Sequence, residues 1–169
     1  MTPEEKIKYL PAGPWIDEPD ELYFNHKGID CKISRILAFE NNGRIFGGHC
    51  CGYCKIPELM ATSECFEQST TAELGFSVHG GITYSEFAAD GCWIGFDCAH
   101  SGDIVPSMLE TKRRIREELQ QKLIGWNLSP FSKVFIDEYR DINFVRKECE
   151  SLAEQIIDYF KYSSTLPLE

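Results

Sequence analysis

The strongest constraint on the fold is a periodic run of apolar residues between positions 142 and 159. Its members recur every three or four residues, which matches the turn of an α-helix and gathers them on one side. We therefore expect a helix from about residue 141 to residue 162, with Asp141 as its N-cap and Lys161 close to its negative end. The apolar positions are Ile142, Val145, Cys149, Leu152, Ile156 and Tyr159.

The preceding segment carries the signals of another helix. Ser107 and Glu110 form an S-x-x-E capping box, and apolar residues follow near helical spacing among charged ones. We expect a helix over residues 107–124, which Gly125 can end. A loop with anchoring aromatics is predicted for residues 126–135. The apolar positions of the predicted helix are Met108, Ile115, Leu119 and Leu123.

Strand patterns precede both helices. Residues 31–39 and 44–56 have the β-branched and apolar content of strands, and the Asn-Asn-Gly at 41–43 is a turn signal, so the two runs predict a hairpin. Residues 74–84 and 92–100 are the next two predicted strands, joined by a loop of ordinary size. Between the hairpin and these strands, residues 57 to 72 contain a proline and many small polar residues, which predicts an irregular connection.

Strands early and helices late predict an α+β domain. We expect an antiparallel β-sheet of about four or more strands, with the two main C-terminal helices packed on one face. A length of 169 residues and a hydrophobic fraction of 43% fit a single globular domain over residues 1–169. Within it we expect residues 1–30 to form an extended N-terminal arm, residues 31–104 to be mainly β and residues 105–169 to be mainly α.

The charge of the chain excludes some partners. With 27 acidic and 17 basic residues the formal net charge is -10, which opposes bulk binding of nucleic acid and of anionic membranes. An acidic surface instead keeps a protein soluble or faces a basic surface on a partner protein. The sequence has neither a signal-peptide pattern nor a long apolar run, so we expect a cytoplasmic protein with no membrane segment.

The cysteine content raises the question of metal or redox chemistry. Eight cysteines in a chain without a secretion signal are expected to be reduced and mostly packed as small hydrophobic side chains. Cys51 and Cys54 form a C-x-x-C pair and are weak candidate metal ligands. On a regular strand they point to opposite faces, so they could share a metal only if Gly52 broke the strand. Further ligands would have to come from Cys65, His79 or Cys98.

Two of the predicted strands carry a polar phrase. VHGGITY spans residues 78–84 and WIGFDCAHSGD spans residues 93–103. Alternation along the strands allows His79 and Asp97 to share one face if the two strands are neighbours. A carboxylate at the end of an apolar strand needs a partner, and a histidine or an arginine is the natural one.

These residues have a structural and a functional interpretation. In the structural one, Asp97 ties down the backbone of the following turn and His79 donates to it. In the functional one, His100 and Asp103 join them in a cluster that could hold a divalent metal or carry out general acid and base chemistry. These four residues are the candidate catalytic residues. The candidate ligand-binding residues are His79, Gly80, Gly81, Tyr84, Trp93, Asp97, His100 and Asp103.

The motifs of the common mechanistic classes are missing from the sequence. It contains no phosphate-binding G-x-x-x-x-G-K-[ST], no dinucleotide-binding G-x-G-x-x-G, no G-x-S-x-G elbow and no H-E-x-x-H. One basic cluster, residues 112–116, is flanked by glutamates at helical spacings. This pattern favours a solvated, salt-bridged helix face over an anion-binding site.

The motifs together resemble those of a family of small, largely uncharacterised proteins of phages, prophages and bacterial genomes. The family patterns include H-G-G-[IL]-T-Y and G-F-D-C-A-H-x-G-D, and the match spans most of the chain. After C-G-Y the family usually has a glycine-containing segment followed by His-Pro, whereas this chain has CKIPELMATSE. The matching phrases are GPWIDEPDE at 13–21, CGYCKIP at 51–57, HGGITY at 79–84, GFDCAHSGD at 95–103 and YRDINFVRKECESLAEQI at 139–156.

Three functions are compatible with these observations. The resemblance implies a small cytosolic accessory protein of phage or mobile-element type that counters host defence, and the first hypothesis is that it binds a small polar or nucleotide-like ligand. The second is a metal-dependent hydrolase or phosphoesterase that uses the His/Asp cluster. The third is an acidic protein that inhibits a basic partner protein, such as a host-defence effector. The sequence leaves open whether the protein is an enzyme, and a divalent metal is the one cofactor that it suggests.

Overall fold

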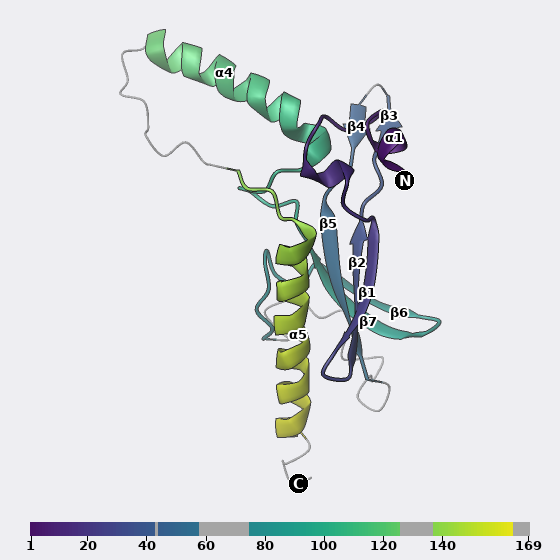
Figure 1. The fold of residues 1–169 in the computed structure, drawn as a ribbon. Coiled ribbons are helices and arrows are strands. Elements are labelled where there is room, and N and C mark those ends of the chain that lie inside the picture. The colour runs from purple at the N-terminus through teal and green to yellow at the C-terminus, as the bar shows by residue number, and fades with distance from the viewer. Residues whose placement is uncertain (43, 58–74, 126–136, 164–169) are drawn as a thin grey trace.

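The computed structural model describes residues 1–42, 44–57, 75–125 and 137–163. Its main feature is a five-stranded antiparallel sheet in the order β1-β2-β5-β7-β6, with helix α5 along one face (Figure 1). The α+β prediction, an antiparallel sheet with two main helices, is confirmed. The elements are β1 Glu21–His26, β2 Ile29–Arg35, β5 Cys50–Ile56, β6 Tyr84–Ala88, β7 Gly91–Asp97 and α5 Ile142–Ser163.

Strands β2 and β5 pair as the predicted hairpin, but the pairing is interrupted before the tip. The chain there forms a separate two-stranded ribbon from β3, Phe39–Asn41, and β4, Arg44–Phe46. Gly47 and Gly48 follow this ribbon with φ angles of 91° and 92°, in the left-handed region that favours glycine. A side chain at Gly47 would also lie 2.6 Å from the carbonyl oxygen of Leu37. The return of the chain into β5 therefore requires glycine.

Helix α5 forms as its sequence pattern predicts. Asp141 is its N-cap, because the Phe144 backbone N–H donates to Asp141 Oδ1 at 2.7 Å and the Val145 N–H donates to the Asp141 carbonyl oxygen at 3.1 Å. The helix packs on β2 and β5. Of the two outer apolar positions, Ile142 is half-buried and Tyr159 is exposed. The four inner ones are 0% exposed: Val145, Cys149, Leu152 and Ile156.

The helix lies close to the sheet because a glycine faces it. A Cβ added at Gly52, in the middle of β5, would lie 2.6 Å from Cys149 Sγ and 2.5 Å from Phe96 Cζ. Any side chain at this position would therefore push α5 away from the sheet. The neighbouring residues of the helix-facing layer are buried: Ile33, Cys54, Ile56, Ile94 and Phe96.

Helix α4, Leu109–Gly125, follows the 3-10 turn η3, Pro106–Met108, and leads away from the sheet (Figure 1). The predicted helix is confirmed, but its capping box does not form, because the buried Ser107 Oγ has no hydrogen-bond partner among the described residues. Ile115 and Leu119 are 48% and 54% exposed, so the predicted apolar stripe is largely uncovered. Of the two main described helices, only α5 lies along the sheet. None of the described helices has the length and apolar character that a membrane crossing needs.

Residues 1–30 were predicted to form a single extended arm, but they do not. They contain a short helix α1, Pro3–Lys6, and a 3-10 turn η1, Pro14–Ile16, and they end in β1, which is an edge strand of the sheet. Trp15 is 3% exposed and packs edge-on against Tyr139, with 5.1 Å between ring centroids. It anchors a second, smaller core with Leu10, Ile16 and Ala38.

The prediction of a strand over residues 74–84 is wrong. The VHGGITY motif lies outside the sheet except for its last residue, Tyr84. Among the described residues of this range, strand pairing begins only at Tyr84, the first residue of β6. Gly80 and Gly81 have φ angles of 69° and 88°, which turn the chain instead of extending it. The next predicted strand is confirmed as β7. The predicted irregular connection over residues 57 to 72 and the predicted loop over residues 126–135 lie almost entirely outside the described residues.

Candidate functional site

A buried carboxylate, Asp103, lies at the centre of a polar cluster that follows β7 in the chain. Its side chain is 1% exposed. Its Oδ2 lies 2.8 Å from His79 Nε2 and accepts the backbone N–H of His100 at 3.0 Å. Its Oδ1 accepts a hydrogen bond from Arg140 Nε at 3.0 Å. We call His79, His100, Asp103 and Arg140 the Asp103 cluster.

The hydrogen bonds fix the protonation of this cluster. Burial alone would raise the pKa of Asp103, but hydrogen bonds from His79, Arg140 and the His100 backbone outweigh it and hold the pKa below its ordinary value. Asp103 is therefore an ionised carboxylate, which can only accept hydrogen bonds, so the proton between it and His79 is on Nε2. In neutral His79, Nδ1 then carries the free lone pair.

His79 is held from two further directions. Its backbone N–H donates to Glu148 Oε2 on α5 at 2.7 Å. Its ring meets Phe144 of the same helix edge-on, with 5.3 Å between ring centroids. The turn that carries His79 is thus attached to the first part of α5, which explains how a residue off the sheet keeps a defined position.

Arg140 reaches the cluster through a backbone connection between two distant segments. The Glu138 N–H donates to the Gly102 carbonyl oxygen at 2.8 Å, and the Ile104 N–H donates to the Glu138 carbonyl oxygen at 3.0 Å. The Arg140 guanidinium also lies over the Phe144 ring, 4.7 Å from its centroid. Sequence reasoning missed Arg140, although a buried aspartate was expected to need a histidine or an arginine.

The basic cluster at residues 112–116 behaves largely as predicted. Arg113 pairs with Glu110 at 2.5 Å, and Arg114 lies 3.9 Å from Glu118, both as exposed helix ion pairs. Lys112 differs, because its Nζ donates to the backbone carbonyl oxygen of Asp103 at 2.8 Å. This hydrogen bond attaches the first part of α4 to the Asp103 cluster.

The imidazole of His100 lies between two carboxylates. Its Nδ1 is 3.8 Å from Asp97 Oδ1 and 3.8 Å from Asp103 Oδ2, too far for a hydrogen bond to either. This nitrogen is buried and has no hydrogen-bond partner among the described residues. Gly80 packs against the ring, where a Cβ would overlap it, so this glycine permits the approach of the VHGGITY turn to His100.

Asp97 takes the role that the structural interpretation gave it. Its Oδ1 accepts the backbone N–H of Ala99 at 2.9 Å, and its Oδ2 accepts the Thr83 hydroxyl at 2.9 Å. The expected pairing of Asp97 with His79 is therefore wrong, because His79 pairs with Asp103 instead. Asp97 lies at the margin of the Asp103 cluster, next to His100.

A third histidine lies near this group, and the sequence reasoning overlooked it. His49 precedes β5, and its Nδ1 is buried without a hydrogen-bond partner among the described residues. Burial lowers the pKa of His49, with the charge of Asp97 acting in the opposite direction. His49 is therefore neutral at neutral pH. Its position two residues before the C-G-Y phrase was the available signal.

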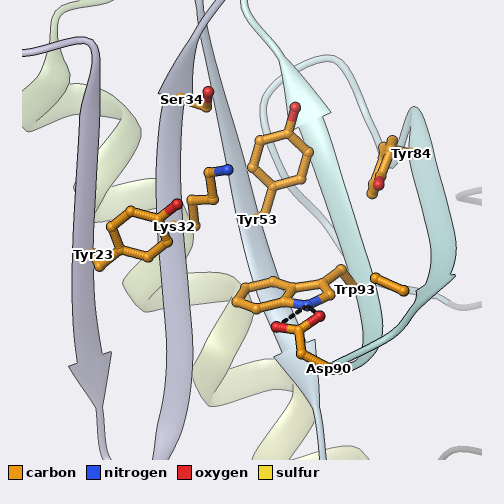
Figure 2. A pocket seen from close by; sticks show the side chains of 8 residues that line it. Tyr23, Lys32, Ser34, Tyr53, Tyr84, Asp90 and Trp93 are labelled. Atoms are coloured by element: carbon orange, nitrogen blue, oxygen red, sulfur yellow. Dashed lines mark hydrogen bonds between the residues drawn. The ribbon is translucent and has the colours of Figure 1, made fainter.

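Tyr84 and Trp93 belong to a different place, on the face of the sheet opposite α5 (Figure 2). They line a hollow of about 280 Å³ that we call the open-face hollow. An adjoining hollow of about 380 Å³ shares Tyr23, Asp90 and Trp93 with it. The eight predicted ligand-binding residues are thus divided between two places. The open-face hollow is lined by Tyr23, Lys32, Ser34, Tyr53, Tyr84, Ala88, Asp90 and Trp93.

The side chains of the open-face hollow support one another. The Tyr53 and Tyr84 rings meet edge-on with 5.1 Å between centroids, and Trp93 Nε1 donates to Asp90 Oδ1 at 3.1 Å. Hydrogen bonding to Glu86 and burial raise the pKa of Tyr84 to about 12, and burial raises the pKa of Tyr53. Both phenols are therefore neutral hydrogen-bonding groups at neutral pH.

Lys32 is the cation that lines the open-face hollow. Its Nζ lies 5.4 Å from the centroid of the Tyr23 ring and 3.5 Å from Glu21 Oε1. Hydrogen bonding to Tyr23 is the largest influence and raises the pKa of Lys32; burial opposes it, and electrostatic interactions with Tyr23 and Glu21 raise the pKa further. The ammonium group remains charged, and Figure 2 shows it between the rings of Tyr23 and Tyr53.

The C-x-x-C pair does not converge on a metal. Strand β5 continues through Gly52 with an unbroken ladder on both sides, so Cys51 and Cys54 point to opposite faces. Cys54 is buried under α5, with its Sγ 3.6 Å from Cys31 Sγ. Cys51 is on the other face, where burial raises the pKa of its thiol to about 12. Cys98 is also buried, and Cys65 lies outside the described residues.

Comparison of the chain with protein-family models, with curated proteins and with solved structures finds no match in any of the three. Two places in the molecule therefore bear on its function: the Asp103 cluster and the open-face hollow.

Proposed function

We propose that the protein binds a small, polar, ring-containing ligand of the nucleotide type in the open-face hollow. The observation that carries the proposal is the set of aromatic side chains around the hollow, contributed by four different strands: Tyr23, Tyr53, Tyr84 and Trp93. Base rings stack on such side chains, and ligand sites combine aromatic walls with a few polar groups.

The polar groups of the hollow suit a ligand with hydrogen-bonding edges and an anionic substituent. Lys32 supplies a positive charge, and Ser34 and Tyr53 supply hydroxyl groups that donate and accept. Asp90 is already bound by the Trp93 indole, which leaves its carboxylate at one side of the hollow (Figure 2). A ring stacks between the aromatic walls while its anionic group pairs with Lys32.

The size of the hollow limits the ligand. A volume of about 280 Å³ is at the lower end of ligand pockets, which run from roughly 300 to 1,000 Å³. One ring system with its sugar or a comparable substituent fits this volume better than a dinucleotide. The resemblance to phage proteins supplies the setting, in which binding of a nucleotide-like signal would withhold it from host defence.

The test is calorimetric titration with nucleosides, with nucleoside monophosphates and with inorganic phosphate as the ring-free probe. We expect a monophosphate to bind most tightly, because it uses both the aromatic walls and Lys32. Trp93→Ala and Tyr53→Ala should each weaken binding about 5- to 160-fold, since loss of one stacking partner costs about 1 to 3 kcal/mol. Lys32→Met should weaken the monophosphate and leave the nucleoside almost unchanged.

Tyr9→Ala is the matched control, because Tyr9 is an exposed tyrosine outside the hollow. It should bind every probe as the wild type does. The proposal fails if no nucleoside or monophosphate binds, or if Trp93→Ala binds them with unchanged affinity. Circular dichroism of each variant verifies that the fold is intact.

A further inference from the structure

The Asp103 cluster brings two imidazoles and a carboxylate within reach of one ion. One ligand atom each from His79, His100 and Asp103 lies within 4.8 Å of the others. Within the part of the chain that the structure describes, this is the one group of three such residues with that geometry. From this cluster we propose that His79, His100 and Asp103 bind a divalent transition-metal ion of the zinc class, with Asp97 as the fourth ligand. The proposal is independent of the ligand in the open-face hollow.

Three separations within the proposed ligand set can be compared with those of a four-coordinate site. Ligand atoms about 2.0 to 2.2 Å from a tetrahedral ion are roughly 3.4 Å from one another. His100 Nδ1 lies 3.8 Å from both Asp97 Oδ1 and Asp103 Oδ2, and His79 Nε2 lies 2.8 Å from Asp103 Oδ2. Shifts of about half an ångström bring these separations to the tetrahedral value.

The second observation is that the buried Nδ1 of His100 has no hydrogen-bond partner among the residues that the structure describes. A buried ring nitrogen without a hydrogen-bond partner costs free energy, and native structures rarely keep one without a reason. This nitrogen faces the carboxylate oxygens of Asp97 and Asp103 at equal distances. A cation between these atoms would satisfy the nitrogen and both carboxylates at once.

The neighbours of the cluster are arranged as a supporting shell. Arg140 holds Asp103 through Oδ1, while Oδ2 accepts the His100 backbone N–H and faces both imidazoles. The Ala99 backbone N–H donates to Asp97 Oδ1 and holds that carboxylate. His79 is held by its backbone bond to Glu148. When Nε2 of His79 binds the ion, its proton moves to Nδ1, so the imidazole stays neutral and no proton is lost.

The ligand set selects the class of ion. Two imidazole nitrogens with two carboxylate oxygens suit zinc, cobalt and nickel, whereas magnesium and calcium prefer all-oxygen sites with six or more ligands. We therefore expect no competition from magnesium or calcium at similar concentrations.

The experiment titrates the full-length protein with cobalt(II) and follows the visible absorption of the ion, with zinc as a displacing competitor. We expect one ion per chain and a spectrum of nitrogen and oxygen ligands. His100→Ala should weaken binding at least about 100-fold and Asp97→Asn about 10-fold or more, as ligands matter at least as much as their supporting groups. His79→Ala also removes a partner of buried Asp103, so the first two variants carry the test if it fails to fold.

His26→Ala is the matched control, because His26 also pairs with a carboxylate, Glu154 at 3.0 Å, but lies away from the cluster. It should bind cobalt as the wild type does. Absence of cobalt binding, or equal binding by a folded His100→Ala variant, overturns the proposal. A sulfur-to-cobalt charge-transfer band also overturns it, because it would place the ion on cysteines. Titration of Trp93→Ala separates this result from the proposed function, since that variant should keep full cobalt affinity.

Discussion

The two faces of the sheet differ in what covers them and in what they carry. The face under α5 presents aliphatic side chains and thiols that are almost fully buried, such as Ile33, Cys54 and Ile94. The opposite face presents Tyr23, Tyr53, Tyr84 and Trp93, and Tyr23 is 62% exposed. Alternating residues of the same strands supply both faces, so the difference lies in the side chains and not in the backbone.

This difference separates stability from function. Burial under α5 removes apolar area from water, which is the main favourable contribution to folding. Large aromatic side chains on an open face remove much less, and an exposed aromatic group of this kind is more informative about binding than about folding. Substitutions on the two faces should therefore have opposite profiles: loss of stability on one, and loss of binding with little loss of stability on the other.

Leu152→Ala on the covered face should have the largest effect on stability. Leu152 is 0% exposed and packs in the main core, so its truncation leaves a cavity and costs about 3 to 5 kcal/mol of unfolding free energy. Urea denaturation followed by circular dichroism measures this loss. A loss below about 1 kcal/mol would mean that α5 does not cover this face tightly.

Asp103→Asn should rank second, at about 2 to 3 kcal/mol near neutral pH, because Arg140 and His79 lose a buried ionised acceptor. The lowered pKa of Asp103 means that the folded state binds this proton less readily than the unfolded chain. Its contribution is therefore present above the ordinary pKa of 3.8 and is lost as the pH falls through the lowered folded value. The wild type and the variant should converge in stability as the pH falls below the lowered folded pKa of Asp103, and a stability difference that stays constant as the pH falls would contradict the assignment.

Tyr23→Thr on the open face should have the smallest effect. The side chain is 62% exposed and threonine keeps the preference for a strand, so the unfolding free energy should stay within about 0.5 kcal/mol of the wild type. The same variant should bind the nucleoside monophosphate more weakly in calorimetry. A large loss of stability would show instead that this face packs against something that contributes to folding.

Local patterns predicted the parts of the fold that depend on short stretches of chain. The apolar spacing of α5 and its Asp141 cap are encoded within one helix, and both are confirmed. Strand β1 was missed because its residues alternate between exposed and half-buried, as expected for an edge strand, and give no clear apolar signal. The VHGGITY motif was misassigned because the positive φ angles of Gly80 and Gly81 outweigh its apolar residues.

The candidate site shows the same limit more strongly. His79, His100 and Asp103 could be singled out because they stand in two short polar phrases, and the structure brings them together. Arg140 could not be added, because it arrives through hydrogen bonds between Glu138 and a segment more than thirty positions earlier in the sequence. The separation of Tyr84 and Trp93 from the histidines likewise follows from the sheet register, which no local pattern specifies.

The hydrogen bonds that join Glu138 to Gly102 and Ile104 also divide the chain into a frame and an appendage. The polypeptide leaves the frame after Ile104 and re-enters it at Glu138, and these hydrogen bonds hold the two ends of the intervening segment together. The base of this appendage is attached to the frame, because the Ser107 N–H donates to the Gly47 carbonyl oxygen, Leu109 packs against the second core and Lys112 donates to the Asp103 carbonyl oxygen. Beyond this base, changes in length or sequence need not alter the spacing of strands or the position of Arg140.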